Sequence, residues 1–460
     1  MFFNSYEFLF GFLPVVAIVW FLLSRSPRAG TWWMVAASLF FYAWYRVDYL
    51  ALLIASIAWN YLISLLIFRQ RSGRESLARF CLIAGIAVNL LLLGLFKYSR
   101  MLAPAIPFAP FLSQLAFPLG ISFFTFSQIA YLVDVYRGAD QPSPIRDYAL
   151  FVSFFPHLLS GPILRHREMI PQFDSALRRR MIPRYFARGL VLIVIGLAKK
   201  TLIADSLAPL VAKAFDSHGM LDSVTAWLGS TAYTFQLYND FSGYCDIAVG
   251  VSLLFNIRIP ENFRAPYRST SIQEFWQRWH ITLGRFFRNY VFFPLGGGRV
   301  RFYRQLPAIL ITFVLVGLWH GVGWTFLLWG TLHGIALAIQ VLWRRLRIRL
   351  PNFAAWALTF AFVDLTWVVF RAPDLAGAAR VLRAMFSGLP KIPLPSGIAN
   401  LDPGQVILIV AMLLIAFPIY SFTIARRMKP GLWTAGVAAI LLTAIVLRFA
   451  SVSYFLYAFF

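Results

Sequence analysis

Residues 317–334 read GLWHGVGWTFLLWGTLHG, an apolar stretch that holds two histidines among glycines, tryptophans and leucines. Most of these side chains suit lipid, whereas an ionisable imidazole is expensive to place in hydrocarbon. Irregular, glycine-rich backbone at membrane depth is tolerated only inside protein or beside a water-filled cavity. The stretch therefore predicts a helical membrane protein in which His320 and His333 have specific partners or roles.

Composition supports the same fold class along the whole chain. Of 460 residues, 60% are hydrophobic and 13% are charged, whereas a soluble domain carries about 25% charged residues. Because apolar runs recur from end to end, we expect one all-α, polytopic membrane domain over residues 1–460. The two cysteines, Cys81 and Cys245, lie inside apolar runs and predict buried thiols rather than a disulfide or a metal site.

Apolar runs near the length of a membrane-crossing helix, about 20 residues, predict about 11–13 transmembrane helices with re-entrant and interfacial pieces among them. The candidate spans are 6–23, 31–45, 49–68, 80–97, 117–136, 185–211, 224–256, 306–319, 322–343, 353–370, 404–424 and 431–448. Lys199 and Lys200 fall inside one of these spans and predict a tilted or broken helix there.

The distribution of arginine predicts the topology, because cytoplasmic loops carry the Lys/Arg excess. With the N-terminus outside, the basic loops 24–30, 69–79, 137–184, 257–305, 344–352 and 425–430 all face the cytoplasm. The loop 371–402 is an exception, since it is basic and faces outward. The net charge of +24 has two interpretations, namely anchoring on an anionic leaflet and a cytoplasmic funnel for a phosphate-bearing substrate.

His320 directly follows the apolar run 306–319. As a helix this run rises only about 21 Å, so it stops short of the far membrane face. We interpret 306–343 as a partition within the membrane, with His320 as a functional residue; a core histidine bonded to a carbonyl is the alternative. For His333, a structural contact between helices and a functional role are equally open.

Residues 271–299 predict a basic amphipathic helix at the cytoplasmic interface, within the basic segment 257–305. Aromatic residues recur there at three- and four-residue spacing, with arginines between them. Ser271 followed by Glu274 predicts a capping box at its start. Two interpretations of this helix stay open, namely a purely architectural role and one in which His280 points inward along the funnel. His157 lies in a Pro/Gly-interrupted piece that predicts a re-entrant segment. His166 and His218 are expected to be solvated loop residues.

Four motifs together resemble one known family over nearly the whole chain. They are FFPHLLSGPILRHREM, YTFQLYNDFSGYCDIAVG, NFRAPYRSTSIQEFWQRWHITLGRFFRNYVFFPLGGGR and GLWHGVGWTFLLWGTLHG. The sequence resembles the membrane-bound O-acyltransferases (MBOAT), closest to the branch of the bacterial alginate O-acetyltransferase AlgI. The resemblance implies a bacterial inner-membrane enzyme that takes acetyl from cytoplasmic acetyl-CoA. It also implies that the acetyl group passes outward, through an extracytoplasmic SGNH or esterase-like partner, to an exopolysaccharide such as alginate or cellulose.

The same resemblance assigns roles to individual residues. The family's essential histidine matches His320, and its second polar position matches His280. A buried histidine supplies a base near pH 7 for acyl transfer, so we expect His320 to take the acceptor proton and His280 to orient or polarise the thioester. Cytoplasmic arginines suit the phosphates of CoA. The expected substrate-binding residues are Arg278, Arg285, Arg288, Trp279, Trp319, Asn239 and Asp240, with His333 and His157 in support.

Neither a bound cofactor nor a metal is expected, and no HExxH pair, P-loop or GxSxG motif occurs. Because no nucleophile is evident, direct transfer is simpler than a covalent acyl-enzyme, although an acyl-histidine relay stays open. Asn239 departs from the apolar residue expected in its motif, which puts the polymer or partner in doubt. The alternatives are acyl transfer from a carrier-protein thioester, as in D-alanylation, a transporter or flippase of an anionic glycan, and a non-catalytic scaffold.

Overall fold

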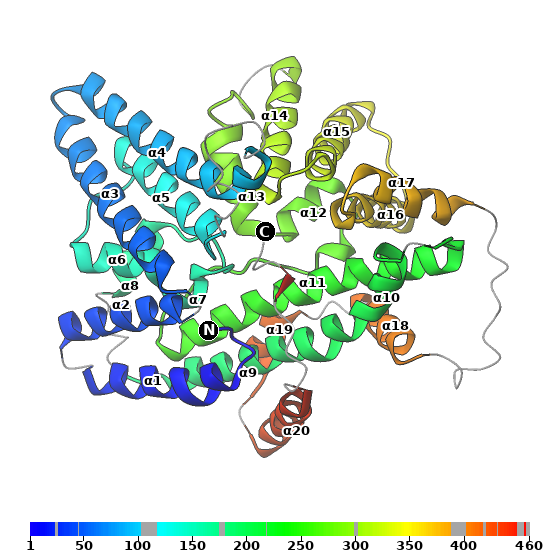
Figure 1. The fold of residues 1–460 in the computed structure, drawn as a ribbon, viewed down its shortest axis with the longest axis horizontal. Helices are drawn as coiled ribbons and strands as arrows, with labels where there is room; N and C mark the ends of the chain where they lie inside the picture. The colour runs from blue at the N-terminus through cyan, green and yellow to red at the C-terminus, as the bar shows by residue number, and fades with distance from the viewer. Residues whose placement is uncertain are drawn as a thin grey trace. The chain divides into compact units, whose positions relative to one another are not determined.

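The structure is a computed structural model. It describes residues 1–460 except 24–25, 45, 103–116, 174–179, 218, 299–301, 388–401, 417–419, 430, 449–454 and 457–460. The described residues form helices joined by turns, with no strand among them (Figure 1). They divide into two compact units. Unit 1 comprises Met1–Ile195, Tyr244–Glu261 and Ala425–Phe459, and unit 2 comprises Gly196–Gly243 and Asn262–Ile424. The prediction of a single domain stays a prediction.

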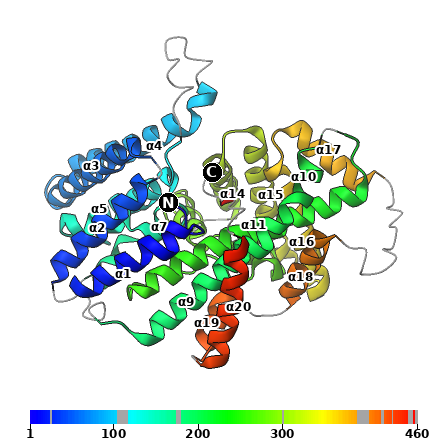
Figure 2. The same ribbon diagram turned by 60° about the horizontal axis from the view of Figure 1, so that its bottom comes forward.

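Unit 1 is built from the N-terminal helices and the C-terminal ones. Its elements are η1 (Glu7–Phe12), α1 (Leu13–Leu22), α2 (Pro27–Ala43), α3 (Asp48–Gln70), α4 (Glu75–Leu102), α5 (Ile121–Tyr136), α6 (Ile145–Ser153), α7 (Phe155–Leu158), α8 (His166–Phe173), most of α9 (Pro183–Ala198), the end of α11 (Ser223–Leu254), part of α19 (Ser421–Arg427) and α20 (Leu432–Arg448). Helices α3 and α4 lie side by side (Figures 1 and 2).

A reciprocal amide pair joins α3 to α4. Asn60 Nδ2 donates to Asn89 Oδ1 at 3.2 Å, and Asn89 Nδ2 donates to Asn60 Oδ1 at 2.6 Å. Gln128 on α5 donates to Ser56 on α3 at 2.9 Å and accepts from Tyr148 on α6 at 3.1 Å. Lipid gives no hydrophobic drive for helices to associate, so such hydrogen bonds add to van der Waals packing in holding these helices together.

Unit 2 contains the two histidines of the opening stretch. Its elements are the end of α9, η6 (Lys199–Ala204), α10 (Asp205–Phe215), the first part of α11, η7 (Pro266–Arg268), α12 (Ile272–Arg278), α13 (Ile281–Phe287), η8 (Arg288–Phe292), α14 (Phe302–His320), α15 (Trp324–Leu346), α16 (Asn352–Arg371), α17 (Leu375–Phe386) and α18 (Pro403–Ala416). The π-helical turn η6 interrupts the predicted span at Lys199 and Lys200, which confirms the predicted break.

Helices α14 and α15 form a tightly packed hairpin that crosses at two glycines. A Cβ atom added at Gly317 would lie 2.4 Å from the carbonyl oxygen of Phe326, and one at Gly330 would lie 2.3 Å from that of Phe313. No side chain fits at either distance, so the backbones touch directly, as small residues allow at membrane helix crossings. This hairpin carries the residues that were predicted to form the partition.

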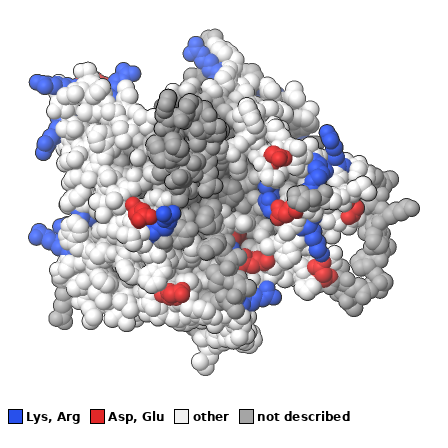
Figure 3. Space-filling view, viewed as in Figure 1, with Lys and Arg blue, Asp and Glu red and all other residues white. Residues whose placement is uncertain are grey.

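The prediction of an all-α polytopic membrane protein is confirmed. Among the described residues, four helices are long and apolar enough to cross a membrane, namely Asp48–Gln70, Glu75–Ser99, Trp324–Leu346 and Asn352–Arg371, and several shorter helices are apolar. Most of the surface visible in Figure 3 is uncharged, and many large apolar side chains are exposed, including Trp324 and Phe353. The total of about 11–13 spans stays a prediction.

Two expectations about helix length are wrong. The helix that ends at His320 begins at Phe302, so it has 19 residues and rises about 28 Å rather than 21 Å. The single amphipathic helix over 271–299 is instead α12, α13 and η8, with a break at His280. The start at Ser271 is confirmed, since its hydroxyl accepts from the amide of Glu274 at 3.2 Å.

Two arginines of the basic segment 371–402, which was predicted to face outward, have partners within unit 2. Arg371 pairs with Asp216 at 2.9 Å, and Arg380 donates to the carbonyl oxygens of Ala214 and Phe215 at the end of α10. Cations are favourable at a helix C-terminus because the backbone carbonyls there are negative. These side chains thus have structural partners, which explains why the loop departs from the charge rule; Lys391 lies outside the described residues.

Candidate active site

His320 is the last residue of α14 and lies in a box of aromatic rings. Its side chain is 1% exposed. The ring centroid of His320 is 4.8 Å from that of Trp319, 5.1 Å from Trp329 on α15 and 5.3 Å from Phe370 on α16. Residues of three helices therefore fix the ring. His320 is thus buried among aromatic rings at the end of α14, and its place in a membrane partition stays a prediction.

His280 links α12 to α13 and has a left-handed backbone, with φ of 42°. Such a φ is uncommon outside glycine and points to a functional constraint or to strain. Asn262, which precedes α12 in the chain, holds this conformation. The amide of Ile281 donates to the carbonyl of Asn262 at 3.0 Å, and the hydroxyl of Thr282 donates to Asn262 Oδ1 at 3.0 Å. The break thus comes from a tertiary contact.

The tautomer of His280 follows from its partner. Nδ1 lies 3.3 Å from Asn262 Oδ1. An amide oxygen only accepts, so Nδ1 carries the proton and Nε2 carries a lone pair. Burial lowers the pKa of His280 to about 3, which keeps the ring neutral near pH 7. In this tautomer Nε2 accepts a hydrogen bond from a thiol or a hydroxyl. Polarising a carbonyl would need a donor at Nε2, so the tautomer favours an orienting role for His280 over a polarising one.

Trp319 lies between the two histidines. Its ring centroid is 6.0 Å from that of His280 and 4.8 Å from that of His320. Phe241 on α11 covers the other side of His280, at 4.8 Å between ring centroids. The structure therefore brings His280, His320 and Trp319 together, as the sequence predicted, in one aromatic cluster of unit 2.

His333 has protein partners on both ring nitrogens. Trp276 Nε1 donates to His333 Nδ1 at 3.2 Å, and His333 Nε2 lies 3.1 Å from Thr366 Oγ1. The hydroxyl of Thr366 itself donates to the carbonyl of Val363, so His333 Nε2 is the donor to Thr366. The ring therefore joins α12, α15 and α16, which favours the structural interpretation of His333 over a role on the substrate.

The three arginines predicted to bind phosphate differ in their surroundings. Arg278 pairs with Glu274 at 2.6 Å and its side chain is 36% exposed. Arg285 is partly exposed on α13, and Arg288 is exposed at the start of η8. All three occupy neighbouring short helices close to His280. Trp279, in contrast, is fully buried and packs on Trp367 at 5.0 Å between ring centroids, so it lies in the core.

Asp240 belongs to a buried ion pair that the sequence did not predict. Lys200 Nζ lies 2.8 Å from Asp240 Oδ1 and 2.9 Å from Asp205 Oδ1. Asn239 donates to the carbonyl of Phe235 at 2.9 Å. Both predicted ligand-binding residues are thus engaged with protein groups, and we interpret them as positioning residues. One lysine and one aspartate in separate apolar runs are the signal that could have revealed this pair.

A second polar contact that sequence reasoning missed lies at Asp364 on α16. Its carboxylate accepts from Ser230 at 2.8 Å and from Thr234 at 2.6 Å, both on α11. One turn further along α16, Trp367 stacks on Trp329, with ring centroids 5.5 Å apart. Asp364 therefore fixes the helix that supplies one wall of the His320 box.

Two of the remaining histidines, His157 and His166, lie apart from this cluster in the sequence and belong to unit 1. His157, in the short helix α7, is buried, and its Nε2 lies 3.0 Å from the carbonyl oxygen of Phe151. The expectation that His166 is solvated is wrong: it is 3% exposed and lies 2.9 Å from both Asp140 and Ser143. His218 lies outside the described residues. Cys81 and Cys245 are buried free thiols, as predicted.

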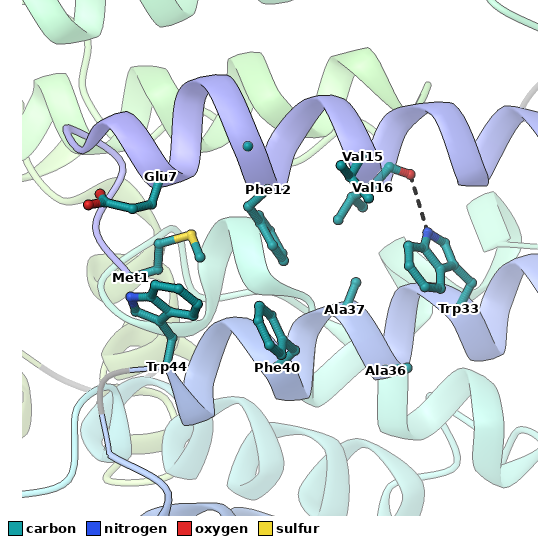
Figure 4. A pocket seen from close by; sticks show the side chains of 11 residues that line it. Met1, Glu7, Phe12, Val15, Val16, Trp33, Ala36, Ala37, Phe40 and Trp44 are labelled. Carbon is teal, nitrogen blue, oxygen red and sulfur yellow. Dashed lines mark hydrogen bonds between the residues drawn. The ribbon is translucent and has the colours of Figure 1, made fainter.

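An apolar groove of about 600 Å³ lies between the first helices of unit 1 (Figure 4). Phe12, Val16, Phe40 and Trp44 line it, and Trp33 Nε1 donates to the carbonyl of Val16 at 3.2 Å. No histidine lines it, and Glu7 is its only carboxylate. The groove therefore lacks the groups that acyl transfer requires.

These features define a polytopic helical membrane protein with a histidine site inside an aromatic core. Residues 82–368 match the model of the membrane-bound O-acyltransferase family, and this chain belongs to that family. It is therefore a membrane-embedded acyltransferase. The matched range contains His280, His320 and His333.

Two O-acetyltransferase relatives match more than four fifths of the chain, and a D-alanyltransferase matches about half of it. The peptidoglycan O-acetyltransferase of Helicobacter pylori is 42% identical over 83% of this chain and 79% of its own length. The probable alginate O-acetylase AlgI of Pseudomonas aeruginosa is 41% identical over 84% of this chain and 75% of its own length. The teichoic acid D-alanyltransferase of Streptococcus thermophilus is 31% identical over 49% of this chain and 57% of its own length.

Proposed function

We propose that this chain is an O-acetyltransferase of the inner membrane that takes acetyl from cytoplasmic acetyl-CoA and passes it outward to an exopolysaccharide, through an extracytoplasmic esterase-like partner. The observation that carries the proposal is the pair of buried histidines, His280 and His320, on either side of Trp319. The O-acetyltransferase relatives that match over more than four fifths of the chain support acetyl as the transferred group.

In the proposed reaction, His320 takes the proton of an acceptor hydroxyl as the oxygen attacks the thioester carbonyl. The carbon–sulfur bond breaks, the thiolate of CoA leaves, and the proton returns to that sulfur. Because Nδ1 of His280 is engaged by Asn262, its Nε2 presents a lone pair, which accepts a hydrogen bond from the thiol of CoA as that thiol forms. A general base contributes about 10²–10⁴-fold to such a step.

The phosphates of CoA would lie against the arginines of α12, α13 and η8. A guanidinium forms paired hydrogen bonds with phosphate oxygens and keeps its charge at any physiological pH. Arg288 is exposed and is the most accessible of the three, whereas Arg278 must exchange Glu274 for phosphate. The basic loop is cytoplasmic in the predicted topology, where acetyl-CoA is found.

A carrier-protein thioester is the second candidate donor. The 31% identity to a D-alanyltransferase over about half of the chain supports a carrier-protein donor. The O-acetyltransferases match over a longer part of the chain, which favours acetyl as the transferred group. A transporter or flippase is set aside, because the chain is an acyltransferase.

The test is donor choice by purified protein in nanodiscs. Acetyl-CoA, an acetyl-carrier protein and a D-alanyl-carrier protein would each be supplied with a soluble acceptor glycan, and the released thiol would be measured. The proposal predicts acceptor-stimulated release of CoA. Release from a carrier protein alone would overturn the proposed donor while leaving the acyltransferase assignment intact.

A further inference from the structure

Three polar side chains in unit 1 form a hydrogen-bonded chain that the reaction at His320 does not use. His166 Nδ1 lies 2.9 Å from Asp140 Oδ2, and His166 Nε2 lies 2.9 Å from Ser143 Oγ. His166 is 3% exposed and Ser143 is 9% exposed. The order of contact is serine, histidine, aspartate, which is the arrangement that activates a serine hydroxyl as a nucleophile.

The partners of His166 fix its tautomer. An ionised carboxylate only accepts hydrogen bonds, so Nδ1 carries the proton and donates it to Asp140. Nε2 then has a lone pair and accepts from the hydroxyl of Ser143. This is the tautomer in which an imidazole takes the proton of a serine as the serine attacks a carbonyl.

The surrounding structure holds the three groups in place. The amide of Gln141 donates to the other oxygen of Asp140 at 2.8 Å. The ring of His166 packs on Tyr131 at 4.5 Å and meets Phe151 edge to face at 5.3 Å. Helix α6 follows Ser143, and helix α8 begins at His166. The two helices pack against each other. The geometry is thus preorganised by packing and by backbone contacts.

We propose that Ser143, His166 and Asp140 form a second acyl-transfer site, which reacts with small acyl thioesters on the cytoplasmic side. Loop 137–184 is basic and faces the cytoplasm in the predicted topology, where acyl thioesters occur. Ser143 lies two residues before α6 (Ile145–Ser153), and the N-terminus of a helix favours negative charge that develops near it.

The proposed step is balanced within the chain and water. The oxygen of Ser143 attacks the thioester carbonyl while its proton moves to His166 Nε2. The carbon–sulfur bond breaks, and the thiolate takes that proton and leaves as a thiol. Water then attacks the acyl-serine, again giving its proton to His166, and the carboxylic acid leaves as Ser143 is restored.

The test is covalent labelling by a fluorophosphonate, which reacts with activated serines. The full-length protein in nanodiscs would be labelled and the modified peptide located by mass spectrometry, with a serine hydrolase in the same tube as reference. The proposal predicts label on Ser143, lost in S143A and slowed by roughly 100-fold or more in H166Q and D140N. Ser153→Ala at the end of α6 is the matched control, since the Ser153 hydroxyl donates to the carbonyl of Ala149, and the label on Ser143 should be unchanged in this variant.

A second measurement separates this site from the reaction at His320. Hydrolysis of acetyl-CoA without acceptor would be followed in His320→Ala and in His320→Ala with Ser143→Ala. The proposal predicts slow hydrolysis in the first protein that disappears in the second. It is overturned if native, monodisperse protein takes no label at Ser143, or if the two proteins hydrolyse acetyl-CoA equally; either result leaves the proposed function untouched.

Discussion

The ion pair between Lys200 and Asp240 gives the sharpest prediction about how the site is held. Lys200→Met removes the cation that lies 2.8 Å from Asp240 Oδ1. The Asp240 side chain is 1% exposed, so its carboxylate would be left buried and uncompensated, whereas Asp205 at 25% exposure reaches water. Breaking a buried pair in this way costs about 3–5 kcal/mol.

The loss should also reach the catalytic cluster. Phe241 follows Asp240 on α11, and its ring lies 4.8 Å from that of His280. A shift of α11 would therefore move His280 relative to Trp319. Misplacement of a reacting group by about 1 Å can lower the rate by roughly 100-fold, so we expect Lys200→Met to lower kcat as well as stability.

Thermal unfolding in detergent, with acyl transfer measured in parallel, checks this reasoning. Lys200→Met should lower the midpoint by several degrees. The pair Lys200→Met with Asp240→Leu should recover most of that loss, because replacing both ions by apolar groups is often neutral. Exposed Lys213→Met is the control and should change stability by less than about 0.5 kcal/mol. Equal midpoints for Lys200→Met and Lys213→Met would refute the account of this pair.

Three further substitutions test the packing and the site. Gly330→Val places side-chain atoms against the carbonyl of Phe313, which lies 2.3 Å from an added Cβ. We expect the free energy of unfolding to fall by about 1–3 kcal/mol, or the protein to fail to fold. The measurement is the yield of monodisperse protein after extraction, and a normal yield would contradict the close crossing. His333→Gln should keep at least a tenth of the activity, because an amide replaces both hydrogen bonds; complete loss in folded protein would indicate a role on the substrate. Arg288→Gln should raise the KM for acetyl-CoA by about tenfold, or roughly 1.4 kcal/mol, with kcat unchanged, and an unchanged KM would remove Arg288 from the phosphate site.

The long helices could be predicted from the sequence because apolar length alone determines them. The run 353–370 corresponds to α16 at Asn352–Arg371, and 49–68 corresponds to α3 at Asp48–Gln70. The break at His280 could not be predicted, since the aromatic spacing continues through it. The left-handed turn there depends on Asn262, a contact made only in the folded chain.

The candidate site shows the same division between local pattern and tertiary contact. Trp319 and His320 could be placed together because they are adjacent in the sequence, at the point where an apolar run meets glycines. The ion pair of Lys200 with Asp240 and the contact of His166 with Asp140 join residues 40 and 26 positions apart. No local motif marks such pairs, so the polarity of each residue was visible and its partner was not.

The most direct test of the central claim is the release of CoA from acetyl-CoA by protein in nanodiscs, with and without an acceptor glycan. His320→Ala would be compared with the wild type and with His333→Gln, and folding of each would be checked by size-exclusion chromatography. The account predicts acceptor-stimulated release that falls by about 100-fold or more in His320→Ala and persists in His333→Gln. Undiminished, acceptor-dependent release by folded His320→Ala would contradict the claim that this buried histidine is the base for acyl transfer.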